Sequence, residues 1–515
     1  MITLFVLPVI SIEAQTAKTY PTLVEAVLQK AGANRVELEQ FLDKYRTDEP
    51  KSSGNSNTKN ETNLKYKAAC FLVSNMDIHY SETFYWADSL NQKVEFNEQS
   101  YPNYSESKKA FKELTAKRKL HAIIGKEYDI HKIKGAFLIQ NLESAFSAWQ
   151  SSKSNYLTFD EFCEYLLPYR SLTEKLEVWR PQFADTFKIK DQGNRWNSIT
   201  EPANDLSKTV GAYFINSFSF EEKNNPTSFL SPSQLLFRKQ GHCEDQVNLT
   251  NLVFRSQGLP CSVNMIPYHA TSTGRHYWNS TIDRNHDIVA FEGSRTTEEF
   301  KLGREPSKVV KFTYSKQKDV PGNWVEESEI PDNYLRRTNF IDVTDQYWRT
   351  KDLRCTLSIT QQKKLAYIAV FNGLQWCPAY WGKITEKSDV VFPKMSCGVA
   401  YLPMLYVNGK LVPAAYPTLL YDTKEEKVLK PDKENRHTIT LNEQENYLKY
   451  RTGKRYRLYY WDNKWELITE KTATLEPRLT FENVPSNALL LMVPEYSARK
   501  ERPFVVNENG ERVWW

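Results

Sequence analysis

The sequence predicts an α+β protein of several domains: a helical N-terminal domain, a mixed α+β core, and a β-rich, sandwich-like C-terminal domain. Its 515 residues correspond to roughly three domains of ordinary size. Apolar residues follow a helical period in the first part of the chain and alternate with polar residues near its end. We expect the three domains to span residues 16–190, 191–321 and 322–515.

Composition narrows the class of protein. Hydrophobic residues make up 40% of the chain and charged residues 25%, a mixture typical of globular proteins with buried cores. The formal net charge is only +5 and no dense basic run occurs, so we expect no nucleic-acid partner. Beyond the N-terminus, no apolar stretch approaches the roughly 18 residues that a membrane-spanning helix needs, and we expect no membrane span.

Residues 1–15 predict a signal segment. Met1–Ala14 is short and apolar and is followed by Gln15, as in the apolar part of a secretion signal. No basic residue precedes this stretch, and a buried N-terminal strand is the alternative. The segment predicts export to the periplasm or the cell surface.

Helical spacing predicts the N-terminal domain. Apolar side chains recur at helical steps at Tyr66, Ala69, Cys70 and Val73. Thr158 and Glu161 have the spacing of a capping box, in which the side chain and backbone of each residue bond to the other. Pro168 then ends the predicted helix, because proline lacks the N–H that a helix interior uses.

After about residue 322 the period changes to that of strands. Tyr456, Leu458 and Tyr460 alternate, and Asp462–Asn463 predicts a turn into a second strand. The domain is also rich in tryptophan, at Trp376, Trp381, Trp461, Trp465, Trp514 and Trp515. These rings suit either a platform for a glycan or peptide or the core of the sheets, and burial habits favour the core.

The central domain carries a candidate nucleophile, Cys243. It precedes a run in which Leu249, Leu252 and Val253 share one helical face. Gly258, followed by Leu259–Pro260, ends this helix. Cys243 therefore lies at a helix N-terminus, where the backbone dipole is expected to favour the thiolate and lower the thiol pKa.

A hairpin after this helix supplies a candidate base and acid. His276 begins a predicted strand at 276–283, and a second strand follows at 287–292. A hairpin centred near residue 284 places Glu292 opposite His276, and opposed residues point to the same face. A thiol, an imidazole and a carboxylate so arranged form a nucleophile, its base and the group that orients the base.

Other interpretations of these residues are possible. Cys243 alone is compatible with an ordinary buried cysteine, and His276 alone with a core histidine. A metal site built from Cys243, Cys261, His269 and His276 would lack both a C-x-x-C pair and a recognised histidine spacing. We therefore expect no metal ion and no organic cofactor.

The ordered set of motifs resembles the transglutaminase-like superfamily. G-x-C at a helix start, G-L-P at its end, H-x-W-N opening a strand and an acid ending the next strand carry this likeness over about a fifth of the chain. The whole length is similar to exported bacterial transglutaminase-like proteins described as cysteine proteases, on the segments 162–165, 168–170 and 342–344.

This resemblance implies a papain-like core with a Cys–His–Asp triad. Cys243 would be the nucleophile and His276 the base, and Glu292 stands where the family usually has Asp. The backbone N–H of Cys243 would be one oxyanion donor, and Gln240 is a candidate for the second.

The predicted function is thiol-dependent acyl transfer on a peptide, protein or peptidoglycan-like amide. Hydrolysis by a peptidase or amidase is favoured over cross-linking by a transglutaminase, because water is the default acceptor. The alternative is a non-catalytic surface protein with a relict core, whose C-terminal domain binds a glycan or peptide.

Overall fold

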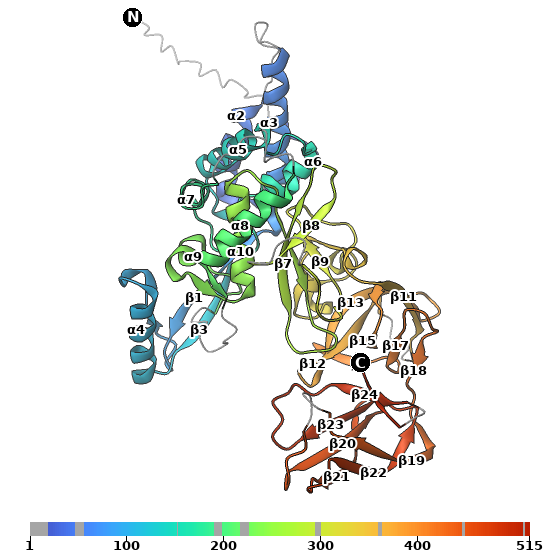
Figure 1. The fold of residues 1–515 in the computed structure, drawn as a ribbon. Helices are drawn as coiled ribbons and strands as arrows, with labels where there is room; N and C mark the ends of the chain where they lie inside the picture. The colour runs from blue at the N-terminus through green and yellow to red at the C-terminus, as the bar shows by residue number, and fades with distance from the viewer. Residues whose placement is uncertain are drawn as a thin grey trace, which may run out of the picture. The chain divides into compact units, whose positions relative to one another are not determined.

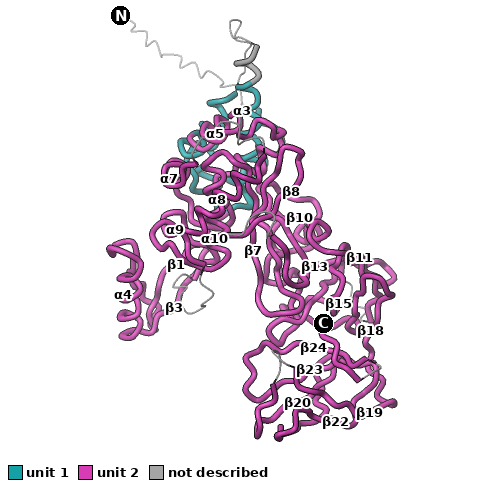
Figure 2. Tube along the Cα trace, in the orientation of Figure 1, with its two compact units in different colours: residues 1–79, 128–139 teal, residues 80–127, 140–515 magenta. Residues whose placement is uncertain are grey.

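The computed structural model describes residues 19–46, 56–151, 153–189, 198–216, 226–293, 300–358, 363–444, 449–507 and 510–515. The predicted signal segment, residues 1–15, lies outside the described residues. The chain divides into two compact units, residues 1–79 with 128–139 and residues 80–127 with 140–515 (Figure 2). The domain boundaries expected at residues 190 and 321 stay a prediction.

The first unit is built around three helices, α1 (Thr22–Lys30), α2 (Arg35–Tyr45) and α3 (Ser56–Ser74). Each helix contributes apolar side chains that are fully buried, among them Leu28, Phe41 and Leu72. The helical spacing predicted around Ala69 and Val73 is confirmed, because both side chains are buried on α3.

The expectation of a purely helical N-terminal domain is wrong for residues 80–128. Three strands pair there in the order β2-β1-β3, and β1 is a segment rich in aromatic residues, which suit a pleated surface. The capping box at Thr158 and Glu161 is confirmed. From residue 80 to residue 186, the helices and strands are β1 (Tyr80–Ala87), β2 (Lys93–Val94), α4 (Tyr104–Lys117), β3 (His121–Tyr128), α5 (Gly135–Gln150), α6 (Phe159–Glu161) and α7 (Arg180–Thr186).

An antiparallel sheet in the order β10-β9-β6-β7-β8 forms the centre of the second unit. Helix α10 contacts β7, and α8 contacts β8 (Figure 1). The elements are α8 (Thr200–Tyr213), β4 (Ile215–Asn216), α9 (Pro232–Arg238), β5 (Gln240–Gly241), α10 (Cys243–Ser256), β6 (Ser262–Ile266), β7 (His276–Ile282), β8 (Ile288–Phe291), β9 (Val310–Phe312) and β10 (Phe340–Asp342).

The two faces of this sheet carry different clusters. Phe291 stacks on Phe254 of α10, and Asn279 donates to the Val247 carbonyl of the same helix, so these residues face α10. Because side chains alternate along a strand, Trp278 lies on the opposite face, where it joins a cluster with Ile266. The central sheet therefore has an α10 face and a Trp278 face.

The hairpin of β7 and β8 has a different register from the one predicted. Asn279 pairs with Phe291, which sets Glu292 level with Trp278 rather than with His276. The turn is centred at Asn285, because the Asp283 carboxylate accepts from the backbone N–H groups of residues 285 and 287. The shift is two residues, and an even shift keeps Glu292 on the predicted face.

The C-terminal region is β-rich, as predicted. Its larger sheets run in the orders β13-β12-β15-β17-β18 and β21-β20-β23-β24-β25. The strands are β11 (Thr350–Thr356), β12 (Leu365–Asn372), β13 (Gln375–Lys383), β14 (Asp389–Ser396), β15 (Val399–Val407), β16 (Lys410–Pro413), β17 (Thr418–Leu420), β18 (Lys427–Val428), β19 (Asp432–Asn442), β20 (Arg455–Trp461), β21 (Trp465–Thr472), β22 (Arg478–Ser486), β23 (Leu490–Pro494), β24 (Pro503–Val506) and β25 (Arg512–Trp514).

Three tryptophans of this region pack against each other, and others pack against tyrosine or phenylalanine rings. Trp461 is buried and contacts Trp376 and Trp465 edge-to-face, with ring centroids 5.4 and 5.1 Å apart. Trp381 and Trp515 are also buried. For these three buried rings, the structure favours the sheet core over an exposed platform.

Within the described residues, no helix is long and apolar enough to cross a membrane. All seven cysteines carry free thiols in this part of the chain. The described residues also contain no group of three metal-ligating side chains placed to hold an ion.

Candidate active site

A capping interaction fixes the start of the helix that carries Cys243. The Asp245 carboxylate accepts from the backbone N–H of His242 and from that of Leu230, both at 3.1 Å. Gly241 precedes this cap, and a Cβ on it would lie 2.7 Å from the Asp245 Oδ2. Only glycine fits there without moving the carboxylate, so the G-x-C spacing has a steric cause.

The other end of α10 is anchored by a buried cation. Arg255 donates to the backbone carbonyls of Tyr165, Arg170 and Cys261 at 2.8 to 3.1 Å. Burial lowers the pKa of Arg255 to about 10. The segments 162–165 and 168–170, singled out in the sequence, therefore help to hold the helix in place.

The surroundings of the Cys243 thiol are acidic. Its Sγ donates a hydrogen bond to the Glu244 Oε2 at 3.3 Å. Burial first, and then the Glu244 charge, raise the pKa of the Cys243 thiol, while a hydrogen bond from the Tyr277 backbone and the charge of Arg275 act in the opposite direction. The lowered pKa predicted from the helix start is wrong, because burial and a neighbouring carboxylate outweigh the helix dipole.

Arg275 is the partner of this carboxylate. Its guanidinium lies 3.1 Å from the Glu244 Oε1, and 52% of its side chain is exposed, against 8% for Glu244. The same guanidinium lies over the Tyr277 ring, 5.7 Å from its centroid. The Glu244 carboxylate, whose negative charge is offset by Arg275, therefore lies directly beside the Cys243 thiol.

His276 and Glu292 are in contact. The His276 Nε2 lies 3.2 Å from the Glu292 Oε1, and both side chains are largely buried, with exposed fractions of 24% and 18%. The His276 ring lies between two other rings, with centroids 6.0 Å from His269 and 5.9 Å from Trp278. The carboxylate and the two rings together orient the imidazole.

The thiol and the imidazole lie on different faces of the sheet. Cys243 packs against the cluster on the α10 face that contains the Tyr277 side chain. His276 lies with Trp278 on the other face, at the first residue of β7. Among the described residues, no hydrogen bond joins Cys243 to His276. The structure therefore brings the predicted base, His276, and the predicted acid, Glu292, together, and places the Cys243 thiol in the cluster that contains Tyr277, the next residue after His276.

A comparison with known families finds one match in this part of the chain. Residues 195–291 match the transglutaminase-like superfamily. The central segment is transglutaminase-like. The match includes Cys243 and His276 and ends one residue before Glu292, so the family part of the predicted resemblance is confirmed for this segment. No curated protein matches the chain.

Gln240, the candidate second oxyanion donor of the transglutaminase-like domain, lies in β5. Its backbone pairs in parallel with Ile215 of β4, and the residue is half-buried. Within the described part of the chain, its side chain has no hydrogen-bond partner. Its role as an oxyanion donor stays a prediction.

Gly293 lies where the chain after β8 and Glu292 comes close to α10. Gly293 follows Glu292 and has a left-handed backbone, with φ 50°, which favours glycine. A Cβ on Gly293 would lie 3.0 Å from the Gln246 side chain of α10. This close approach fixes the end of β8 against the helix that carries the thiol.

Three further residues near the site make contacts that the sequence did not predict. Glu244 and Arg275 flank Cys243 and His276 in the sequence, and their charges were the available signal. The sequence pattern suggests only a metal-ligand role for His269, whereas in the structure its ring contacts the His276 ring. Burial, His276 and Arg304 lower the pKa of His269 to about 4, so its imidazole is neutral at neutral pH.

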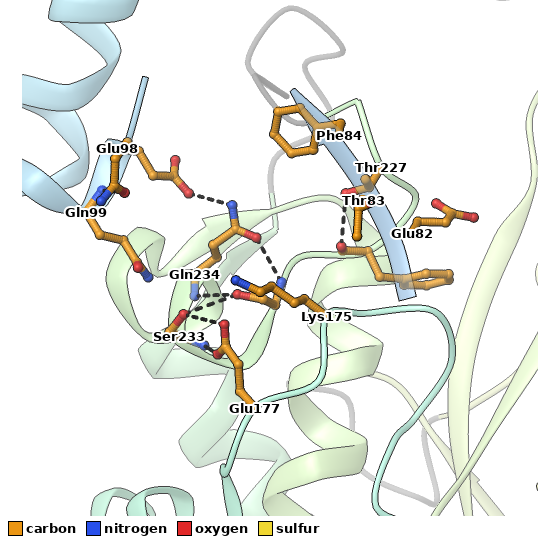
Figure 3. Close-up of a pocket in the computed structure, with 13 residues that line it drawn as sticks. Glu82, Thr83, Phe84, Glu98, Gln99, Lys175, Glu177, Thr227, Ser233 and Gln234 are labelled. Atoms are coloured by element: carbon orange, nitrogen blue, oxygen red, sulfur yellow. Dashed lines mark hydrogen bonds between the residues drawn. The ribbon is translucent and has the colours of Figure 1, made fainter. Parts of the chain in front are cut away.

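A polar pocket of about 280 Å³ lies on the α10 side of the domain (Figure 3). Its carboxylates are engaged by the protein: Glu98 accepts from Arg238 and Gln234, and Glu177 accepts from the backbone and hydroxyl of Ser233. Phe229 lines the pocket and contacts the Tyr277 ring at 6.0 Å. We interpret these hydrogen bonds as the contacts that hold α9 in place next to α10, the helix that carries Cys243.

Proposed function

We propose that the protein is a thiol-dependent acyl-transfer enzyme that acts on amide bonds, with Cys243 as nucleophile, His276 as base and Glu292 as the group that orients the base. The observation that carries the proposal is the 3.2 Å contact between His276 and Glu292, next in sequence to Tyr277, whose side chain packs in the same cluster as Cys243. The transglutaminase-like match supports it, because that superfamily commonly contains cysteine hydrolases and transferases.

In the first half-reaction, His276 takes the thiol proton and the Cys243 sulfur attacks the amide carbonyl. The tetrahedral oxyanion is held by the backbone N–H of Cys243 and, in this proposal, by Gln240. The C–N bond then breaks, the amine leaves with the proton from the imidazolium, and a thioester remains on Cys243. Glu292 stabilises the imidazolium during both proton transfers.

In the second half-reaction, His276 activates the acceptor that attacks the thioester. Water gives a carboxylic acid and restores the thiol, which is the reaction of a peptidase or amidase. An amine acceptor would instead give a new amide, as in cross-linking. We favour water, and we take the substrate to be a peptide, protein or peptidoglycan-like amide of the periplasm or cell surface.

The reaction requires the thiol and the imidazole to meet. They lie on opposite faces of the sheet at the start of β7, and catalytic hydrogen bonds often form fully only when substrate is bound. We expect substrate to displace the Cys243–Glu244 hydrogen bond and bring the sulfur within reach of the ring.

A non-catalytic binding protein is the second candidate. The observations that favour it are the raised pKa of the Cys243 thiol and its hydrogen bond to Glu244, both of which disfavour the thiolate. On this alternative, the core is relict and the protein only holds a peptide or glycan.

One experiment separates the two candidates. The full chain is incubated with a pool of random octapeptides, with and without a labelled primary amine, and the products are identified by mass spectrometry. The proposal predicts cleavage that is lost in Cys243→Ala and retained in Cys355→Ala, a control at another half-buried thiol. Products that carry the amine label would indicate cross-linking, and the absence of any Cys243-dependent product would support the binding protein.

A further inference from the structure

The strand β8 forms one edge of the central sheet. The strand order β10-β9-β6-β7-β8 places it last, and in the described residues it pairs only with β7. Its sequence, Ile288–Phe291, is apolar throughout, and residues 288–290 are half-buried rather than covered. Natural sheets usually protect such edges with charged residues, proline or a covering segment.

The hydrogen-bond alternation of the hairpin shows which backbone groups face this edge. The Asp283 N–H donates to the Asp287 carbonyl at 3.0 Å, which marks a hydrogen-bonded pair. In an antiparallel ladder such pairs alternate, so residues 289 and 291 bond to β7, and Ile288 and Ala290 turn their N–H and C=O groups outward. Within the described part of the chain, these outward groups have no partner.

A cavity of about 600 Å³ lies along the same edge. It is lined by both apolar and polar side chains, which come from the start of α8, from β8 and from two later segments, including Thr200, Ile288, Ala290, Phe300 and Lys301. Trp278 contacts Phe300 and Tyr347, with ring centroids 5.6 and 5.1 Å apart, and also contacts His276 at 5.9 Å. The Trp278 ring therefore packs between two aromatic side chains that line the cavity and His276, the candidate base.

We propose that the β8 edge binds an extended polypeptide, which adds to the sheet as a further strand. Two residues of this peptide, spaced by two, would exchange backbone hydrogen bonds with Ile288 and Ala290, and its alternate side chains would enter the cavity beside β8. β8 runs directly into Glu292, so the bound peptide is led to the acid–base pair. This inference rests on the proposed acyl-transfer function and assigns its substrate class as extended, unfolded peptide.

A second copy of the chain is a less suitable occupant. A stable dimer needs about 800 Å² of buried surface on each partner. An edge of four residues with two outward-facing positions is short for that purpose, whereas it matches the length of a peptide held near a scissile bond.

Proline substitution tests the edge directly. In a Cys243→Ala background, which prevents turnover, the full chain is immobilised and exposed to a pool of random octapeptides. We expect a subset of the octapeptides to be retained. Ala290→Pro removes an outward N–H that β7 does not use, so the fold should tolerate it while retention falls about tenfold or more. Ala290→Ser keeps the N–H and serves as the matched control, with retention near that of the parent.

A chemical probe gives the same test without changing the protein. Retained octapeptides are resynthesised with alternate backbone amides methylated. Methylation of one set should abolish retention and methylation of the other set should spare it, because only alternate residues of an added strand bond to the edge. Because the protein is unchanged in this comparison, it still tests whether peptides add to the β8 edge even if Ala290→Pro melts at a lower temperature than the parent.

Three results would overturn the proposal: no octapeptide is retained, both methylated sets bind equally, or folded Ala290→Pro retains peptides as well as Ala290→Ser does. Self-association that Ala290→Pro abolishes, measured by sedimentation, would identify a second copy as the occupant and would also overturn it. Failure of the enzymatic proposal is distinguishable, because the octapeptides would then bind at β8 without any Cys243-dependent cleavage.

Discussion

The two faces of the central sheet hold the two halves of the candidate site in different states. On the Trp278 face, the His276 ring is already oriented by Glu292 and by two neighbouring rings. On the α10 face, the Cys243 thiol is bonded to Glu244, and its pKa is raised. The comparison indicates that the proposed base and acid are already in contact, whereas the proposed nucleophile is a thiol whose ionisation is disfavoured by burial and by Glu244.

The largest expected effect comes from removing the thiol. Cys243→Ala should lower kcat for octapeptide cleavage by about 10³-fold or more, since no other group can form the thioester. Cys261→Ala changes a fully buried thiol just beyond the C-terminal end of the same helix, where no catalytic role is proposed. It should retain turnover and lose only about 1 kcal/mol of stability, measured by denaturant unfolding. Equal loss of turnover in both variants would mean that Cys243→Ala lowers activity by disturbing the fold rather than by removing the nucleophile.

Changes at Glu292 test the opposite face. Glu292→Gln keeps the size of the side chain but removes the charge that stabilises the imidazolium, and we expect kcat/KM to fall by about 10 to 10³-fold. Glu292→Asp should retain much of the activity, because the resembling family usually has Asp there. Unchanged kcat/KM in Glu292→Gln would remove the carboxylate from the catalytic set and leave a Cys–His pair.

Substitution of Glu244, the acidic neighbour of the thiol, should have a smaller effect, and it should raise rather than lower the reactivity of Cys243. Glu244→Gln removes the charge that helps to raise the Cys243 pKa, so the thiolate fraction at neutral pH should rise, by about tenfold for each unit by which the pKa falls. Arg275→Gln removes an opposing positive charge and should slow alkylation. The measurement is the rate of Cys243 alkylation by iodoacetamide, located by mass mapping. If both variants alkylate at the wild-type rate, Glu244 does not control the thiol.

The smallest effect concerns His269. Its folded pKa of about 4 lies below the ordinary value of 6.5, so the unfolded chain binds more protons between these values. This contribution to stability is present above about pH 6.5 and is lost as the pH falls toward 4. Melting temperatures measured across this range should therefore fall less steeply in His269→Phe than in wild type. Parallel curves would show that His269 is not held neutral by its surroundings.

Local sequence signals predicted the helix start and the face of Glu292, because a glycine cap and a period of two are determined within a few residues. The exact register of the hairpin was not predictable, since it depends on the Asp283 carboxylate closing the turn around residues 284–286. The strands at residues 80–128 were missed because their pairing is not local. The thiol pKa was predicted in the wrong direction, because burial of Cys243 and the orientation of Glu244 are properties of the folded chain.

The most direct test of the central claim is to trap the acyl-enzyme. The full chain is mixed with the octapeptide pool, quenched with acid to preserve thioesters, and mapped by mass spectrometry in wild type and in His276→Ala. The account predicts an acyl adduct on Cys243 in wild type that is strongly reduced in His276→Ala. An adduct on another cysteine, or an equal adduct in both proteins, would contradict the assignment of Cys243 and His276 as nucleophile and base.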